Sequence, residues 1–170
     1  MKILGIDPGY ERCGIAIIEK SSGGGGGKDI VLFSDCIRTS AKSGMPDRLW
    51  ELGQALSLVI KRHKPDVAAI EELYFAKNTK TAMQVAEARG VIQYRIRSAG
   101  LSCFEYHPNT IKIAITGHGS ADKKDIAGMI PRLVSFNTDK KIDDELDAVA
   151  VALTHSAHSR QNYPQERGVL

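Results

Sequence analysis

The chain has 170 residues, of which 42% are apolar and 25% charged, and its formal net charge is +3. This composition is that of one globular domain with a core of its own, and no apolar run approaches the roughly 20 residues that a membrane-spanning helix requires. Three widely spaced cysteines argue against a disulfide framework or a zinc site and indicate a reducing, cytoplasmic setting, while the mild positive charge permits a phosphate-bearing partner without requiring one.

The N-terminal part predicts three strands. Residues 3–6 and 14–19 are apolar and are separated by a proline-glycine turn. Five consecutive glycines at 23–27 predict a flexible, exposed loop. A phosphate-binding loop would be followed by a helix, whereas the apolar run 30–33 indicates a third strand. The first strand carries a single lysine and does not have the pattern of a signal peptide.

Helices and strands alternate in the next part of the chain, which predicts α/β architecture. Apolar residues recur at helical spacing over 45–62, and Pro65 ends that helix before a fourth strand at 66–72. A long helix over 78–98 then leads to a short fifth strand at 101–106.

The C-terminal part predicts further helices. They run from Pro108 or Asn109 through Lys112, from Asp122 onward, and from Asp143 or Asp144 to about His158. We therefore expect residues 1–158 to form one domain and residues 159–170 to form a polar C-terminal tail.

Carboxylates stand where predicted strands end and where the last helix begins. Asp7 ends the first apolar run, and Glu71 and Glu72 end the fourth strand. Successive strand side chains point to opposite faces, so the pattern leaves open which of these two glutamates faces inward. Asp144 and Asp147 are three residues apart and lie on one face of a helix.

Taken alone, the pair at 144 and 147 is more typical of a helix-capping acid and a surface acid. Together with Asp7 and Glu71 it indicates an oxygen-rich site for a hard cation such as magnesium, because strand ends and a helix start can meet at one edge of an α/β sheet. Four carboxylates there would repel one another strongly. Two divalent ions about 3.5–4 Å apart would neutralise them and form a two-metal phosphodiester cleavage site.

Longer blocks of sequence surround these carboxylates. They are Gly5-Ile6-Asp7-Pro8-Gly9, the block from Ala69 to Asn78, Ala88-Arg89-Gly90, and Asp144-x-x-Asp147-Ala148. In order and spacing, across nearly the whole chain, they resemble the RuvC family of bacterial Holliday-junction resolvases. The resemblance implies an RNase H-like fold, with a five-stranded mixed sheet flanked by helices. It also implies a homodimer that uses magnesium to cut two strands of a four-way DNA junction symmetrically, and a branch-migration motor as a further partner.

The resemblance also implies roles for individual residues. The catalytic, metal-binding acids would be Asp7, Glu71, Asp144 and Asp147, which selects Glu71 over Glu72, although Asp143 beside Asp144 leaves an ambiguity of one residue. They would hold two Mg²⁺ ions per active site, and Mn²⁺ would serve as a substitute ion. The five-glycine loop departs from the family pattern and is interpreted as an elaboration far from the site.

The substrate contacts implied by the resemblance are aromatic and basic. They are Tyr74, Phe75, Lys77, Lys112 and Lys123. One of the two aromatic residues would pack in the core and the other would stack on bases at the crossover, and Tyr74 matches the family's junction-contacting aromatic best. Lys112 and Lys123 would clamp the scissile phosphate or stabilise charge in the transition state.

Small residues recur every four positions in the helix over 78–98, at Ala82, Ala86 and Gly90. A glycine inside a helix costs roughly 1 kcal/mol relative to alanine, so Gly90 calls for a reason. Close approach of a second subunit's helix is one reason, and tight packing on the protein's own sheet is the alternative.

Two other classes of function fit parts of the pattern. Gly-Ile-Asp-x-Gly also resembles the first phosphate loop of actin- and hexokinase-like nucleotide-binding proteins, but these need two lobes and a second glycine-rich loop, for which this chain is too short. An RNase H-fold nuclease that acts on RNA is the other alternative, and the block from Glu71 to Asn78 argues against it.

Overall fold

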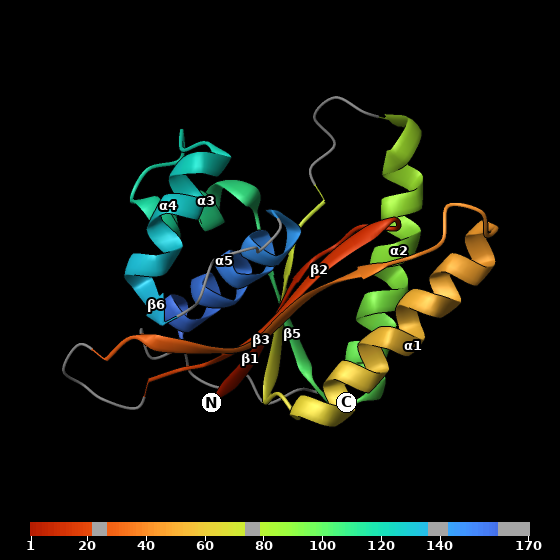
Figure 1. The fold of residues 1–170 in the computed structure, drawn as a ribbon, viewed down its shortest axis with the longest axis horizontal. Helices are drawn as coiled ribbons and strands as arrows, with labels where there is room; N and C mark the ends of the chain where they lie inside the picture. Colours follow the sequence, from red (N-terminus) through yellow and green to blue (C-terminus); the bar gives the residue numbers. More distant parts are fainter. Residues whose placement is uncertain (22–26, 74–78, 136–142, 160–170) are drawn as a thin grey trace, which may run out of the picture.

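The computed structural model describes residues 1–21, 27–73, 79–135 and 143–159 (Figure 1). Within these ranges, a six-stranded mixed sheet has the order β5-β4-β1-β2-β3-β6. β1 pairs parallel to β4 and antiparallel to β2, β2 pairs antiparallel to β3, and the edge strands β5 and β6 pair parallel to their neighbours. The strands are β1 (Lys2–Asp7), β2 (Arg12–Glu19), β3 (Asp29–Arg38), β4 (Val67–Glu71), β5 (Ser102–Tyr106) and β6 (Val134–Ser135).

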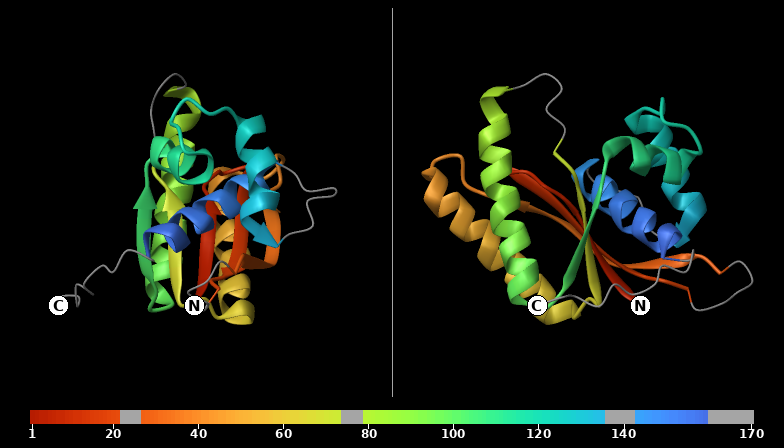
Figure 2. Two further views of the ribbon diagram at one scale, coloured as in Figure 1. Left: turned by 90° about the vertical axis from the view of Figure 1, so that its left-hand side faces the viewer. Right: turned by 180° about the vertical axis from the view of Figure 1, so that it is seen from behind.

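Helices cover both faces of the sheet, as Figure 2 shows. One layer contains α1 (Met45–His63) and α2 (Thr79–Ser98), and the other contains α3 (Pro108–Thr116), α4 (Lys123–Leu133) and α5 (Asp143–His158). The sheet therefore has a separate hydrophobic core on each side. Successive residues of β1 face opposite cores. Leu4 and Ile6 pack under α1 and α2, whereas Ile3 packs under the layer of α5.

This arrangement confirms the mixed α/β sheet flanked by helices that the sequence predicts. The predicted count of five strands is wrong by one, because β6 adds a two-residue edge strand beside the start of β3. Two residues are too few to produce a periodic pattern. β3 is also longer than the predicted run 30–33, because it pairs along β2 as far as Arg38.

The helix after β5 is longer than predicted. It continues past Lys112 to Thr116, since Ile111 and Ile115 are both buried and Gly117, with a φ of 85°, provides the left-handed C-cap. The next helix begins as predicted, because the side chain of Asp122 accepts hydrogen bonds from the first turn of α4 in a capping box.

None of the helices in the described part of the chain combines the length and the apolar composition needed to cross a bilayer. The predicted tail lies outside the described residues from position 160 onward.

Candidate active site

Asp7 and Glu71 end two neighbouring parallel strands. In the register of β1 and β4, Ile6 lies opposite Ile70, so the next residue of each strand reaches the same edge of the sheet. Alternation along both strands turns these two side chains toward the layer of α5, because Ile6 and Ile70 face the other core. Glu72 follows on the opposite parity, and this places Glu71 rather than Glu72 on the face of Asp7.

Two glycines bring α5 down onto this edge. A Cβ on Gly5 would overlap the backbone of Ala148, and a Cβ on Gly14 would overlap the carbonyl oxygen of Asp144. Because Gly14 is the β-partner of Asp7, this contact places the first turn of α5 directly beside Asp7. Gly5, in the block around Asp7, is therefore needed for the close approach of α5.

The carboxylates at this edge interact electrostatically. Burial, followed in order of size by the charges of Glu71, Asp147 and Asp144, raises the pKa of Asp7 from its usual 3.8 to about 8. Burial, with a smaller contribution from the charge of Asp147, raises the pKa of Glu71 to about 7. The fold thus brings together the four acids that the sequence predicts from three distant segments.

Basic residues surround these acids. The Nζ atom of Lys123, in the first turn of α4, donates a hydrogen bond to Oδ2 of Asp147 across 2.8 Å. Lys112, on α3, is close enough that its charge lowers the pKa of Glu71, as does that of Lys123. Lys112 and Lys123, which the family resemblance implies as clamps of the scissile phosphate, therefore both lie at the carboxylate site.

One cation at the site was not predicted. Arg12, the first residue of β2, donates through Nη2 to Oδ2 of Asp144 in an ion pair. The two residues are 132 positions apart, and Arg12 belongs to no pattern that indicates such a contact. Only the pairing of β2 beneath α5 brings them together.

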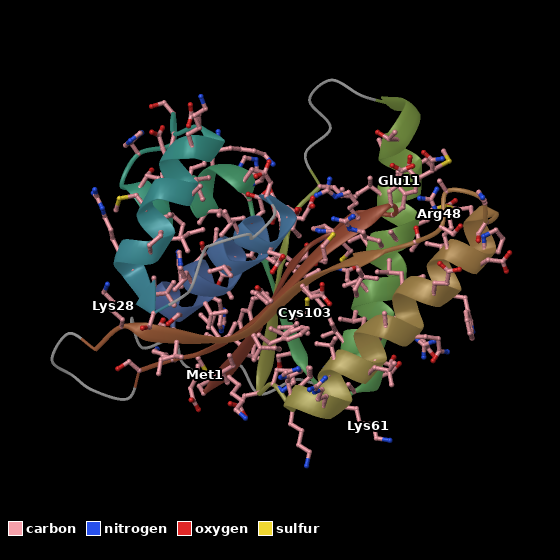
Figure 3. All side chains as sticks on the ribbon, viewed as in Figure 1. Met1, Glu11, Lys28, Arg48, Lys61 and Cys103 are labelled. Atoms are coloured by element: carbon pink, nitrogen blue, oxygen red, sulfur yellow. The ribbon has the colours of Figure 1, made fainter. Side chains whose placement is uncertain are left out.

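A buried arginine holds the turn that follows Asp7. Arg48 lies in the first turn of α1 with its guanidinium 4.7 Å from the centre of the Tyr10 ring, and its Nε donates to Thr39 Oγ1 across 2.9 Å. Its Nη2 is 3.5 Å from a carboxylate oxygen of Glu11, and Figure 3 shows these two side chains near each other. Thr39 in turn donates to the carbonyl oxygen of Tyr10. These contacts fix the chain between β1 and β2 beside the site.

The carboxylates suit a hard divalent cation by their chemistry. They are oxygen donors, and a cation would offset both the burial and the repulsion that raise the pKa of Asp7. As they stand, no three His, Cys, Asp or Glu side chains within the described ranges are grouped closely enough to hold one ion. Asp144 and Asp147 instead contact Arg12 and Lys123, so their side chains would have to turn to share a metal with Asp7.

The remaining predicted residues have different positions. Tyr74, Phe75 and Lys77 lie outside the described residues, between β4 and α2. Asp143 is exposed, whereas Asp144 is half-buried and acts on Asp7, which favours Asp144 in the pair with Asp147.

Known proteins match this chain along almost all of its length. The family model described as crossover junction endodeoxyribonuclease RuvC matches residues 3–155. The chain is 41% identical to the protein of that name from Finegoldia magna, over 98% of this chain and 99% of that protein. It is 42% identical to the one from Caldicellulosiruptor saccharolyticus, over 98% of each.

Solved structures agree with the sequence matches. Thermus thermophilus RuvC superposes with a TM-score of 0.86 and 28% identity over 95% of this chain and 96% of that one, and so does the same protein in complex with a Holliday junction substrate. The yeast mitochondrial Holliday junction resolvase Ydc2 shares the fold, with a TM-score of 0.69 and 14% identity over 94% of this chain and 79% of that one. The chain therefore belongs to the RuvC family of crossover junction endodeoxyribonucleases.

Proposed function

We propose that this protein is a structure-selective DNA endonuclease that resolves Holliday junctions by paired, symmetric, metal-dependent nicks, in recombination and DNA repair. The observation that carries the proposal is the meeting of Asp7, Glu71, Asp144 and Asp147 at one sheet edge, in a chain that belongs to this family. The relatives named above are crossover junction endodeoxyribonucleases, and one solved relative holds a Holliday junction substrate.

We assign the four carboxylates as ligands of two divalent cations, with Mg²⁺ as the natural ion and Mn²⁺ as a substitute. The high pKa of Asp7 supports this assignment, because a carboxylate that is costly to ionise in the protein alone gains most from a nearby cation. When bound, such ions activate a water and stabilise the leaving oxygen of a phosphodiester.

The protein's own groups have distinct tasks in this proposal. Asp7 and Glu71 are fixed by strands, so their positions are set by the sheet. Asp147 accepts a hydrogen bond from Lys123 and would turn from it to bind a cation. Lys123 and Lys112 add positive charge beside the carboxylates, where the phosphate of the cut strand would lie, and stabilise the charge that develops on it.

Contacts to the junction itself are assigned to the segment between β4 and α2. Tyr74 would stack on a base at the crossover, Phe75 is the alternative for that role, and Lys77 would contact a phosphate. The segment directly follows Glu71 and Glu72 in the chain, so any contact it makes to DNA is tied to the catalytic edge.

We infer that the protein acts as a homodimer, because a four-way junction offers two equivalent strands and each chain carries one site. α2 is the proposed contact. Its outward face presents Ala86 and Gly90 together with Met83 and Tyr94, which are 72% and 67% exposed. The proposal also includes a branch-migration motor as a further partner and a cytoplasmic location. It assigns residues 1–158 to the nuclease domain.

Cleavage of synthetic substrates tests the function. The protein is incubated with Mg²⁺ and a four-way DNA junction, with a linear DNA duplex of the same sequence, and with a structured RNA. We expect paired nicks at symmetric positions of the junction, and little cutting of the other two. Equal cutting of the duplex, or preferential cutting of the RNA, would contradict the proposal.

A further inference from the structure

The ion pair between Arg12 and Asp144 occupies a carboxylate that the proposed function gives to a metal. Arg12 is on the same face of β2 as Gly14, which lies against the backbone of Asp144. The guanidinium donates to Oδ2 of Asp144, and the thiol of Cys36 lies 3.7 Å from the same oxygen. Two groups from the sheet thus contact one carboxylate oxygen.

These contacts draw Asp144 away from the other acids. Arg12 and Cys36 belong to β2 and β3, whereas Glu71 belongs to β4 on the opposite side of β1. For Asp144 to share a cation with Asp7, its side chain must turn back toward β1 and leave Arg12.

The side chain of Arg12 is able to leave. It is 50% exposed, whereas that of Asp144 is 21% exposed, so the guanidinium can move into solvent without opening the core. A cation between Asp7 and Asp144 would also repel a guanidinium at hydrogen-bonding distance from the same carboxylate.

We propose that Arg12 is an internal counter-ion of Asp144 that competes with the metal for this carboxylate and thereby sets the metal affinity of the site. The inference rests on the proposed assignment of Asp144 as a metal ligand. It gives Arg12 a role in positioning a ligand, with no contact to the reacting atoms. Loss of Arg12 should therefore strengthen metal binding.

The neighbouring strand offers a matched control. Arg38 is the β-partner of Arg12, carries the same charge and is exposed, and its side chain, like that of Arg12, interacts with the thiol of Cys36. Within the described residues it forms no ion pair with a carboxylate. Arg38→Gln therefore reports how much the loss of one positive charge and of one arginine contact to Cys36 strengthens cation binding. Any further gain in Arg12→Gln measures the competition for Asp144.

The experiment measures Mn²⁺ binding to the full-length protein without DNA, from the paramagnetic resonance signal of the free ion. We expect Arg12→Gln to bind Mn²⁺ about threefold to fivefold more tightly than Arg38→Gln, which is the range that a partly exposed ion pair supports. Arg12→Lys retains the charge and should remain close to wild type. Equal affinities in Arg12→Gln and Arg38→Gln, or a weaker affinity in Arg12→Gln, would overturn the inference, and thermal melting checks that each variant is folded.

A second pair of variants separates this inference from the proposed function. In an Asp144→Asn background, Arg12→Gln should no longer strengthen Mn²⁺ binding beyond the effect of Arg38→Gln, because there is no carboxylate left to compete for. A gain that persists there would overturn the role given to Arg12 while leaving the metal site in place. A wild-type protein that binds no Mn²⁺ would overturn the metal assignment, and the inference with it.

Discussion

Asp7 and Glu71 lie side by side at the ends of two parallel strands, and the charge of Glu71 acts on Asp7 more strongly than that of Asp147 or Asp144. The sheet thus holds two carboxylates together in a partly buried position that costs free energy unless a cation or a proton is present. Such an arrangement opposes stability and is typical of a functional site.

Neutralising single acids should stop cleavage. We expect Asp7→Asn, Glu71→Gln and Asp147→Asn each to reduce junction cutting by more than the about 10–100-fold that substitutions around a metal ligand cost, because each removes a proposed ligand. Junction binding should be largely retained, since affinity comes mostly from basic contacts to phosphates. Gel-shift and cleavage assays on the same preparations measure both effects.

Glu72→Gln is the matched control for this series. Glu72 is the neighbour of Glu71 but lies on the opposite strand parity, and its backbone N–H is bonded to the carbonyl oxygen of Tyr106. We expect it to cut junctions at a rate near that of wild type. Near wild-type cutting by any of the three site variants, or a dead Glu72→Gln variant, would refute the site assignment.

Asp7→Asn should also stabilise the protein. A carboxyl whose pKa is raised from 3.8 to about 8 holds its proton longer in the folded state than in the unfolded state, so the folded protein loses stability as the pH rises from about 4 to about 8. An amide at this position cannot ionise and avoids that loss. In EDTA we expect the free energy of unfolding to rise by on the order of 1–2 kcal/mol at pH 8, after allowance for partial solvent screening.

Denaturant unfolding at two pH values tests this expectation. The difference between Asp7→Asn and wild type should be largest near pH 8 and should shrink toward pH 4. A difference that is constant with pH would mean that Asp7 is not the group whose ionisation is opposed.

The sequence carried most of what fixes the fold and the acids of the site. Alternation and helical spacing locate strands and helices because each element has a single face toward a core. The acids stand out because carboxylates that end apolar runs are rare without a purpose. The inward position of Glu71 follows only once the register with β1 is known. Alternation shows that neighbouring residues face opposite sides of the sheet, but it does not show which side either of them faces.

Other features depend on distances that no local pattern encodes. The pairing of Val134 and Ser135 with the start of β3 is made by two residues. The ion pair of Arg12 with Asp144 joins a strand start to a helix start. The contacts of Arg48 to Tyr10 and Glu11 join a helix to a turn more than thirty positions earlier. Such contacts form only when the sheet is assembled, whereas secondary-structure propensity depends on residues a few positions apart.

Metal dependence should follow the ion's coordination chemistry. We expect cleavage with Mg²⁺ or Mn²⁺ and binding without cleavage in Ca²⁺, because Mg²⁺ demands tight octahedral geometry while Ca²⁺ is larger and more loosely coordinated. Cleavage rates on a labelled junction, with each ion at equal concentration, measure this. Full cleavage in EDTA would contradict a metal-dependent reaction.

Tyr74→Ala should weaken junction cutting far more than it weakens folding. The reason is that an aromatic face stacked on a base at the crossover contributes about 1–3 kcal/mol per base. Cleavage kinetics and thermal melting are compared with those of Phe75→Ala, which should destabilise the fold if Phe75 is the core member of the pair. A large fall in the melting temperature of Tyr74→Ala would instead assign core packing to Tyr74 and base stacking to Phe75.

The stripe of small residues on α2 bears on the proposed dimer. Ala86 and Gly90 are both exposed, and a Cβ built on Gly90 meets no atom within 4 Å. The alternative that these two residues pack against the protein's own sheet is therefore wrong. The same outward face carries Met83 and Tyr94, so apolar surface flanks the two small residues and is available to a second subunit.

Ala86→Trp should consequently give a folded monomer. The large ring has room in the single chain, whereas it would separate two helices that approach at the small residues. Light scattering should show half the wild-type mass, circular dichroism an unchanged helix content, and cleavage assays the loss of paired nicking. Ala157→Trp is the matched control, because Ala157 is also an exposed helical alanine but lies in the last turn of α5, and it should remain a dimer. A dimeric Ala86→Trp variant would exclude this face of α2 as the contact, because two helices cannot close on the small residues with a tryptophan between them.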